Sequence, residues 1–209
     1  MENIDSVLFR RMVMSFGGTF LCGVCVAFFR QAALGVDPFS SVPCGLFNLS
    51  SSLGYGTIYL ILNASLVVFM MIFARKYIGP NTFVNMFLLG NVTEFSEKVL
   101  VSFCSLPSIY IRVVYMCIAT PLCCLGAAMC ITAGLGVSAY DWIALTIADR
   151  QKRASFRIIR IFTDVFCVLF GAVCGYRPGA GTVILALGTG PIVAFFRTYL
   201  LEPVIMKHN

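Results

Sequence analysis

A buried carboxylate is the residue in this chain best suited to chemistry. Asp164 lies inside the apolar run 161–166, and Asn63, 101 residues earlier, lies inside another apolar stretch. A carboxylate in hydrocarbon costs several kcal/mol unless it faces a cavity, a partner or a proton. We therefore predict that Asp164 binds a proton or a cation and that Asn63 lines the same site. A structural hydrogen bond, or a salt bridge to Arg160 one turn earlier, is the alternative.

Further polar residues could line the same route. Glu94 and Asn85 share a third apolar stretch, and Asp141 stands between Tyr140 and Trp142. A carboxylate flanked by aromatic rings suits a polyatomic cation, although Asp141 could instead cap a helix start. The predicted substrate- or ion-binding residues are Asp164, Asn63, Glu94, Asn85, Asp141, Trp142 and Tyr140.

The remaining reactive side chains give no catalytic pattern. Arg30, Arg157 and Arg160 stand at the ends of apolar stretches, where we expect them to reach toward lipid headgroups; a gating role is the alternative. The ten cysteines fall mostly within apolar runs, and the single histidine, His208, is too isolated to complete a metal site. The sequence predicts no cofactor, no metal centre and no enzyme activity.

The composition defines the environment of these residues. Of 209 residues, 59% are hydrophobic and only 11% are charged, whereas soluble domains carry roughly 25% charge. So few charged residues cannot cover a water-facing surface, which predicts an integral membrane protein. The net charge of +6 comes from basic residues at segment ends, so it does not indicate a nucleic-acid partner.

Two parts of the chain resemble each other at a fixed offset. Leu34-Gly35-Val36 returns as Leu135-Gly136-Val137, and Phe39 corresponds to Tyr140. Four later positions return 100 residues on: Gly79, Thr82, Gly90 and Phe95 correspond to Gly179, Thr182, Gly190 and Phe195. We predict one membrane domain over residues 1–209, with repeats at about 10–103 and 108–200. An odd number of spans in each repeat would invert the second one, as in many secondary transporters.

The apolar stretches fit that division. We expect six transmembrane helices at about residues 12–29, 56–74, 81–100, 109–133, 156–176 and 181–200. Two stretches, 39–51 and 140–149, are too short to cross a core of about 30 Å and are predicted to be half-helices. The predicted fold is therefore an all-α polytopic membrane protein with two inverted three-helix repeats. We also expect Pro121 to kink its helix, and Pro191 to kink or break its helix near the middle.

The distribution of Lys and Arg predicts the orientation. With six spans, 11 of the 15 basic residues fall on one side and 4 on the other. Because basic loops stay in the cytoplasm, both termini are predicted to be cytoplasmic.

The repeated motifs resemble a known bacterial family. A Leu-Gly-Val loop before a short helix, and Gly and Thr at the start of an apolar span (Gly79 and Thr82; Gly181 and Thr182), resemble the YczE/YyaS/YitT group, especially its YczE-like branch. The resemblance covers about residues 10–200. It implies an integral membrane protein of a group often labelled as transporters.

The resemblance also implies acidic site residues. Members carry an acidic residue just after the Leu-Gly loop of each half, which Asp141 matches, and one in the fifth span, which Asp164 matches. In the first half Ser40 stands at that position and Asp37 lies earlier, so a symmetric pair of acids is not expected.

We therefore expect a small-molecule secondary transporter, proton- or cation-coupled, with a mid-membrane site between inverted repeats. Acidic and aromatic side chains favour a cationic or aromatic solute. The alternatives are a non-transporting scaffold that binds a partner protein through the basic loop 150–153, and a passive channel. Small-residue spacings such as Gly171 and Gly175 are compatible with a homodimer without requiring one.

Overall fold

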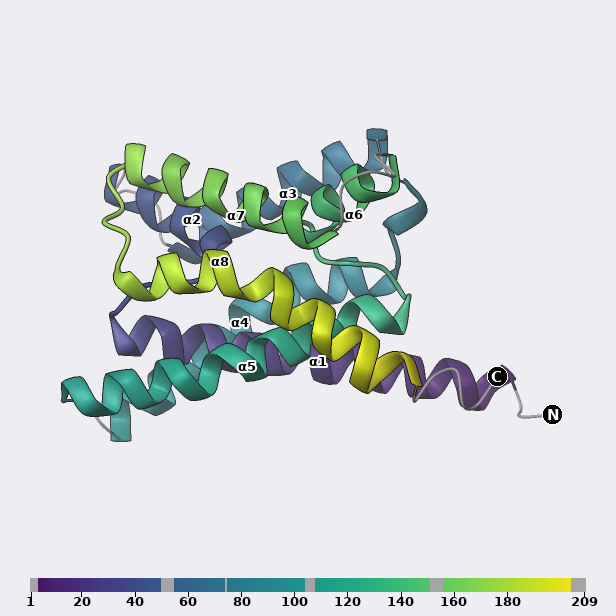
Figure 1. Cartoon of the computed structure of the whole chain (residues 1–209), viewed down its shortest axis with the longest axis horizontal. Coiled ribbons are helices and arrows are strands. Elements are labelled where there is room, and N and C mark those ends of the chain that lie inside the picture. Colours follow the sequence, from purple (N-terminus) through teal and green to yellow (C-terminus); the bar gives the residue numbers. More distant parts are fainter. Residues whose placement is uncertain (1–3, 50–54, 74, 104–107, 151–155, 204–209) are drawn as a thin grey trace.

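Helices and short loops form all of the chain that the computed structural model describes, namely residues 4–49, 55–73, 75–103, 108–150 and 156–203. No strand occurs in these ranges. The helices, drawn in Figure 1, are α1 (Ile4–Ala32), α2 (Pro38–Leu49), α3 (Tyr55–Phe73), a 3-10 turn η1 (Arg75–Tyr77), α4 (Pro80–Phe103), α5 (Ile109–Ala133), α6 (Asp141–Arg150), α7 (Phe156–Val173), α8 (Ala180–Phe195) and a π-helical extension η2 (Phe196–Leu201).

Within the described residues, four segments are long and apolar enough to cross a bilayer: Leu8–Ala32, Gly56–Phe73, Ile109–Ala133 and Ala180–Leu201. Many large apolar side chains on the helices are exposed, including Phe162 and Phe166 of α7. Lipid is the solvent that suits such a surface. The chain is therefore a helical membrane protein. The other two predicted spans, α4 and α7, are helices that carry more polar and charged residues.

The two predicted half-helices are present as α2 and α6, with 12 and 10 residues. At 1.5 Å per residue neither can cross the hydrocarbon core. In Figure 1, α2 follows the loop at the left end of the bundle, while α6 follows the loop at the right end.

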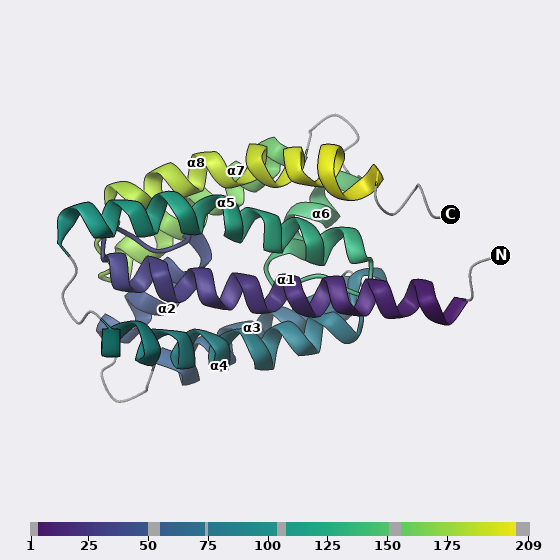
Figure 2. The same cartoon turned by 90° about the horizontal axis from the view of Figure 1, so that it is seen from below.

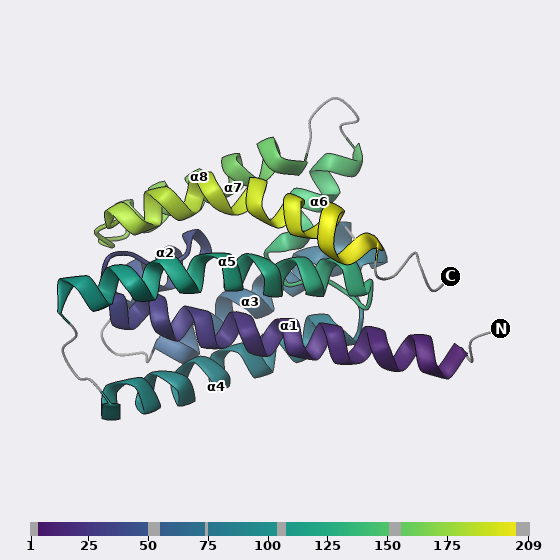
Figure 3. The same ribbon diagram turned by 60° about the horizontal axis from the view of Figure 1, so that its bottom comes forward.

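The centre of the bundle is the crossing of α1 and α5, which lie side by side in Figures 2 and 3. Glycines permit this approach, since a Cβ on Gly18 would stand 2.6 Å from the Gly126 carbonyl oxygen. A Cβ on Gly126 would likewise stand 2.8 Å from the Gly18 oxygen. The thiol of Cys22 also points at the Cys123 carbonyl oxygen, 3.6 Å away.

Matching loop contacts close the two ends of the bundle. At one end the backbone N–H of Asn81 donates to the Leu135 carbonyl oxygen at 3.0 Å. At the other end the backbone N–H of Gly181 donates to the Leu34 carbonyl oxygen at 3.1 Å. These contacts involve the Leu-Gly-Val motifs and the Gly/Thr helix starts that recur in the sequence. The loops concerned lie at opposite ends of Figure 1.

Prolines inside helices do not end them. α5 continues through Pro121, and α8 continues through Pro191. The irregularity in the last helix comes five residues after Pro191, where the coil widens into η2. A break at Pro191 itself is therefore excluded.

Candidate functional site: a charged cluster between the two halves

Asp164 is the most enclosed ionisable residue of the predicted site, with 0% of its surface exposed. One carboxylate oxygen, Oδ1, accepts a hydrogen bond from the Tyr140 hydroxyl. The other, Oδ2, accepts one from Thr189 Oγ1 of α8 at 2.8 Å. Because the donors come from different helices, this carboxylate ties α7 to the start of α6 and to α8.

Arg160 supplies the positive charge of the cluster. Its guanidinium pairs with the Asp141 carboxylate and lies 4.7 Å from the centre of the Tyr140 ring. Its Nε is 3.3 Å from Asp164 Oδ1, but that N–H is not aligned for a hydrogen bond, so attraction between charges dominates there. The side chain is 13% exposed.

The expectation that Arg160 reaches toward headgroups is therefore wrong. Two carboxylates, one of them a turn further along α7, hold its side chain inside the protein. Arg157, one turn earlier, is exposed, as expected. The i,i+4 spacing of Arg160 and Asp164 was the available sequence signal. Thr189 gave no comparable signal.

Helix capping distinguishes the two half-helices. The Asp37 carboxylate accepts a hydrogen bond from the Ser40 amide at 3.0 Å and so caps the start of α2. At α6 the capping oxygen belongs to Ser138, which accepts from the Asp141 amide at 3.1 Å. Asp141 therefore does not cap the helix as the alternative interpretation supposed; its carboxylate is free to pair with Arg160.

A polar cavity of about 110 Å³ lies against this cluster. Both halves of the chain line it, and its four ionisable Asp and Arg side chains are Asp37, Asp141, Arg160 and Asp164. The neutral polar residues of the wall are Ser40, Tyr59, Asn63, Asn85, Ser138, Tyr140 and Thr189, and apolar and cysteine side chains form the rest. Five predicted residues thus meet at one cavity: Asp164, Asn63, Asn85, Asp141 and Tyr140.

The other two predicted residues lie elsewhere. Glu94 has an exposed side chain on α4 and borders a separate, much smaller pocket of about 20 Å³. Trp142 turns away from the cavity and packs with Met70 and Val137. The sequence placed both residues near the site because neighbours in sequence or in the same helix were assumed to share a face.

Asn63 contacts its own helix. Its side-chain amide nitrogen donates to the Tyr59 carbonyl oxygen at 2.9 Å, one turn earlier in α3. The residue is buried and borders the polar cavity. Asn63 therefore faces the same space as Asp164 without the cross-helix bonds that Asp164 makes.

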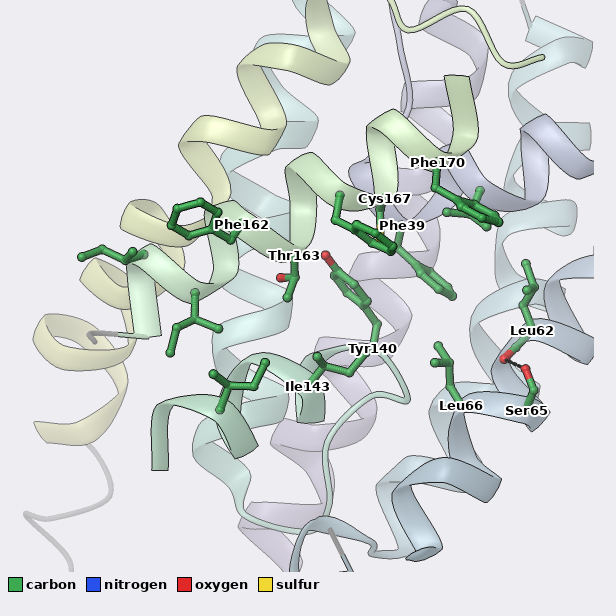
Figure 4. A pocket seen from close by; sticks show the side chains of 15 residues that line it. Phe39, Leu62, Ser65, Leu66, Tyr140, Ile143, Phe162, Thr163, Cys167 and Phe170 are labelled. Atoms are coloured by element: carbon green, nitrogen blue, oxygen red, sulfur yellow. Dashed lines mark hydrogen bonds between the residues drawn. The ribbon is translucent and has the colours of Figure 1, made fainter. Parts of the chain in front are cut away.

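An apolar groove of about 600 Å³ lies on the other side of two aromatic rings. Phe39 and Tyr140 stack with ring centres 5.0 Å apart, and both residues line the groove and the polar cavity. Figure 4 shows these rings behind the groove, with Phe162 and Phe170 of α7 and Leu66 of α3 around it. The wall between groove and cavity therefore includes this ring pair.

Ion pairs also stand near each end of the bundle. Arg30 and Glu97 pair at 2.8 Å, joining α1 to α4. Beyond α3, Lys76 and the Tyr77 hydroxyl both bond to the Asp149 carboxylate, and they hold the pKa of Asp149 below its usual range. Within the described residues, no group of three or more His, Cys, Asp or Glu side chains is placed to hold a metal ion.

The fold and this site define a polytopic helical membrane protein with an enclosed charged cluster. Residues 9–198 match a family described as of unknown function, DUF6198, and the chain belongs to that family. No curated protein and no solved structure matches the chain.

Proposed function

We propose that the protein is a small-molecule secondary transporter of the bacterial inner membrane, built from two inverted repeats of three spans each. The polar cavity between the repeats is the solute site. Its charged cluster carries the proposal, because buried ionisable residues in membrane proteins usually serve substrate or ion pathways. The resemblance to the YczE-like group agrees with this assignment and stays a prediction.

Contacts between equivalent positions support the inverted repeat. Cys22 and Cys123 differ by the repeat offset of 101 and touch each other. Phe39 and Tyr140 have the same offset and stack. When two equivalent residues meet, a twofold axis relating the repeats must pass between them. Both pairs line the polar cavity, so the axis would run through the solute site.

The predicted topology counts α4 and α7 as the two further spans. Three of their polar residues then face the protein rather than lipid: Asn81 and Asn85 of α4 are buried, as is Asp164 of α7. The end carrying Lys76 and Asp149 would be cytoplasmic. Of the basic residues behind that assignment, Lys152, Arg153 and Lys207 lie outside the described residues.

The cluster suggests how coupling works. Asp164 exchanges a proton or a solute cation, while Arg160 holds the carboxylate pair together when the site is empty. Each time a proton or cation binds to Asp164 or leaves it, the charge balance between α6, α7 and α8 changes. Half-helices α2 and α6, entering from opposite ends, are the elements whose movement would open the cavity to one side and then the other.

Accessibility of a cavity cysteine tests the proposal. In a variant whose only cysteine is Cys123, which lines the cavity, a membrane-impermeant maleimide is added to right-side-out and to inverted vesicles. A transporter that alternates between two open states will be labelled from both faces. The matched control keeps only Cys117, which is exposed on the same helix. A thiol in lipid cannot form the reactive thiolate and stays unlabelled.

Two outcomes contradict transport. Labelling of Cys123 from neither face would favour the scaffold alternative. Passage of the reagent into the vesicle, reported by a thiol trapped inside, would indicate a passive channel.

A further inference from the structure

We propose that the apolar groove is a lateral entrance, through which an organic cation with a large apolar body reaches the charged cavity from the bilayer. The inference rests on the proposed function and adds to it a route and a substrate class. Tyr140 and Phe39 form the movable wall between entrance and site.

The groove has the size and lining of a ligand site. Its volume of about 600 Å³ falls within the usual range of small-molecule pockets, roughly 300–1,000 Å³. α2, α3, α6 and α7 supply its walls, with Leu66, Ile143 and Phe166 among the lining side chains. α7 packs on α2, α6 and α8, while α3 packs on α2 and α4, so the groove fills the side of the bundle between α3 and α7.

Tyr140 links the groove to the buried acid. Its ring faces the groove beside Phe39, and its hydroxyl donates to Asp164 (Figure 4 shows the ring). A rotation that opens the ring wall must also break this hydrogen bond. Opening therefore removes a donor from the Asp164 carboxylate at the moment when a cation could replace it.

The charge behind the wall favours a cation. Three carboxyl groups (Asp37, Asp141, Asp164) and one guanidinium (Arg160) line the cavity, which gives a formal charge of −3 + 1 = −2 when all are ionised. Asp37 Oδ1 is buried and has no hydrogen-bond partner among the described residues. An acyl chain of a lipid could fill the groove but would leave Asp37 Oδ1 without a partner. A molecule with an apolar body and a positive charge would satisfy both regions.

Tetraphenylphosphonium is the probe, with tetraphenylborate as its control of the same shape and opposite charge. Binding is measured by equilibrium dialysis against the protein in nanodiscs, with empty nanodiscs subtracted. We expect saturable binding of the cation and at least about tenfold weaker binding of the anion. Equal binding of the two ions, or no saturable binding of the cation, overturns the proposed substrate class.

A pair of variants on α3 tests the route. Ser65 is exposed and lines the groove, so Ser65→Trp will obstruct it; Val68, exposed on the same helix but outside the groove, provides the control Val68→Trp. We expect Ser65→Trp to slow association of the cation about tenfold and Val68→Trp to leave the association rate unchanged. An association rate in Ser65→Trp equal to that of wild type overturns the lateral entrance.

Asp164→Asn separates this inference from the proposed function. It should weaken cation binding about tenfold or more, since charge-assisted contacts are the stronger ones. If Asp164→Asn loses binding while Ser65→Trp keeps the association rate of wild type, the cation reaches the central site by another route, and only the lateral entrance fails. The two-sided labelling of Cys123 does not depend on the groove, so its absence counts against transport itself.

Discussion

The two halves of the molecule present the same frame to the cavity but different charges. In the first half, Tyr59 and Asn63 stand one turn apart on α3 and bond locally, side-chain amide to backbone carbonyl. At the positions 101 residues on, Arg160 and Asp164 stand one turn apart on α7 and reach to α6 and α8. Equivalent backbone positions therefore carry a neutral pair in one half and an ion pair in the other.

The half-helices differ by an exchange of the same two residue types. The first half has Asp37 and Ser40, and the second has Ser138 and Asp141. In each half the earlier residue caps the helix by accepting from the amide three residues later. Placing the acid at the later position frees its carboxylate for Arg160. We infer that the second half carries the ion pairs, while the first half supplies Asp37 and neutral polar groups opposite them.

Removing the positive charge should have the largest effect. In Arg160→Met the carboxylates of Asp141 and Asp164 lose their common partner, and we expect the free energy of unfolding to fall by about 3 kcal/mol. Thermal unfolding in detergent measures this. Arg157→Met, an exposed arginine one turn away, is the control and should melt like wild type. Equal melting of the two variants would mean that the buried pair contributes nothing.

The next largest loss of stability is expected when a carboxylate is introduced into α3. Asn63→Asp buries a carboxyl group with no arginine at position 59, and we expect a loss of about 2 kcal/mol. The double variant Tyr59→Arg, Asn63→Asp restores the i,i+4 pair of the second half and should recover part of the loss. A double variant no more stable than the single one would show that the two halves differ in more than charge.

A smaller effect is expected at the cap of α6. Ser138→Ala removes the oxygen that accepts from the Asp141 amide, and helix caps contribute about 1 kcal/mol. Ser138→Asp, which copies Asp37, should retain most of the stability. Ser102→Ala, at an exposed serine within α4, controls for loss of a hydroxyl. If chemical unfolding shows the same loss of stability for Ser138→Ala as for Ser102→Ala, the capping assignment is contradicted.

The exposed pair beside α6 should matter least. Lys76 and Tyr77 lower the pKa of Asp149, so its folded pKa lies below the unfolded value of about 3.9. The stabilisation is then present above that value and is lost as the pH falls through the folded pKa. Asp149→Asn should melt slightly below wild type at neutral pH, and the difference in melting temperature should shrink in acid. A difference that grows in acid would contradict a lowered pKa of Asp149.

The sequence was sufficient for the helical frame but not for all of the partners within it. Composition and apolar length predicted a helical membrane protein. The segments predicted to begin at about residues 39 and 81 start within one residue of α2 and α4. Asp164 could be recognised because a carboxylate in an apolar run is costly unless it faces a cavity, a partner or a proton. Its ion-pair partner Arg160 could be named from the i,i+4 spacing, but its hydrogen-bond donors could not be read from the sequence, since Thr189 depends on how α8 packs against α7.

Residues near segment ends were the hardest to place. Arg160 looked like an interfacial anchor, because its distance from the membrane centre cannot be judged without knowing how α7 lies in the bundle. Glu94 looked buried for the same reason. Thr93, the residue before Glu94 in α4, is buried, but the turn of the helix puts Glu94 on an exposed face.

Ligand-dependent melting tests the central cavity most directly. Purified protein is heated with a panel of metabolites, vitamins and organic cations at two pH values, because a ligand of the folded state raises the melting temperature. We predict a concentration-dependent rise for an organic cation that disappears in Asp164→Asn and persists in Arg157→Met. A rise of equal size in Asp164→Asn, or none across the panel in wild type, would contradict a solute site at this carboxylate.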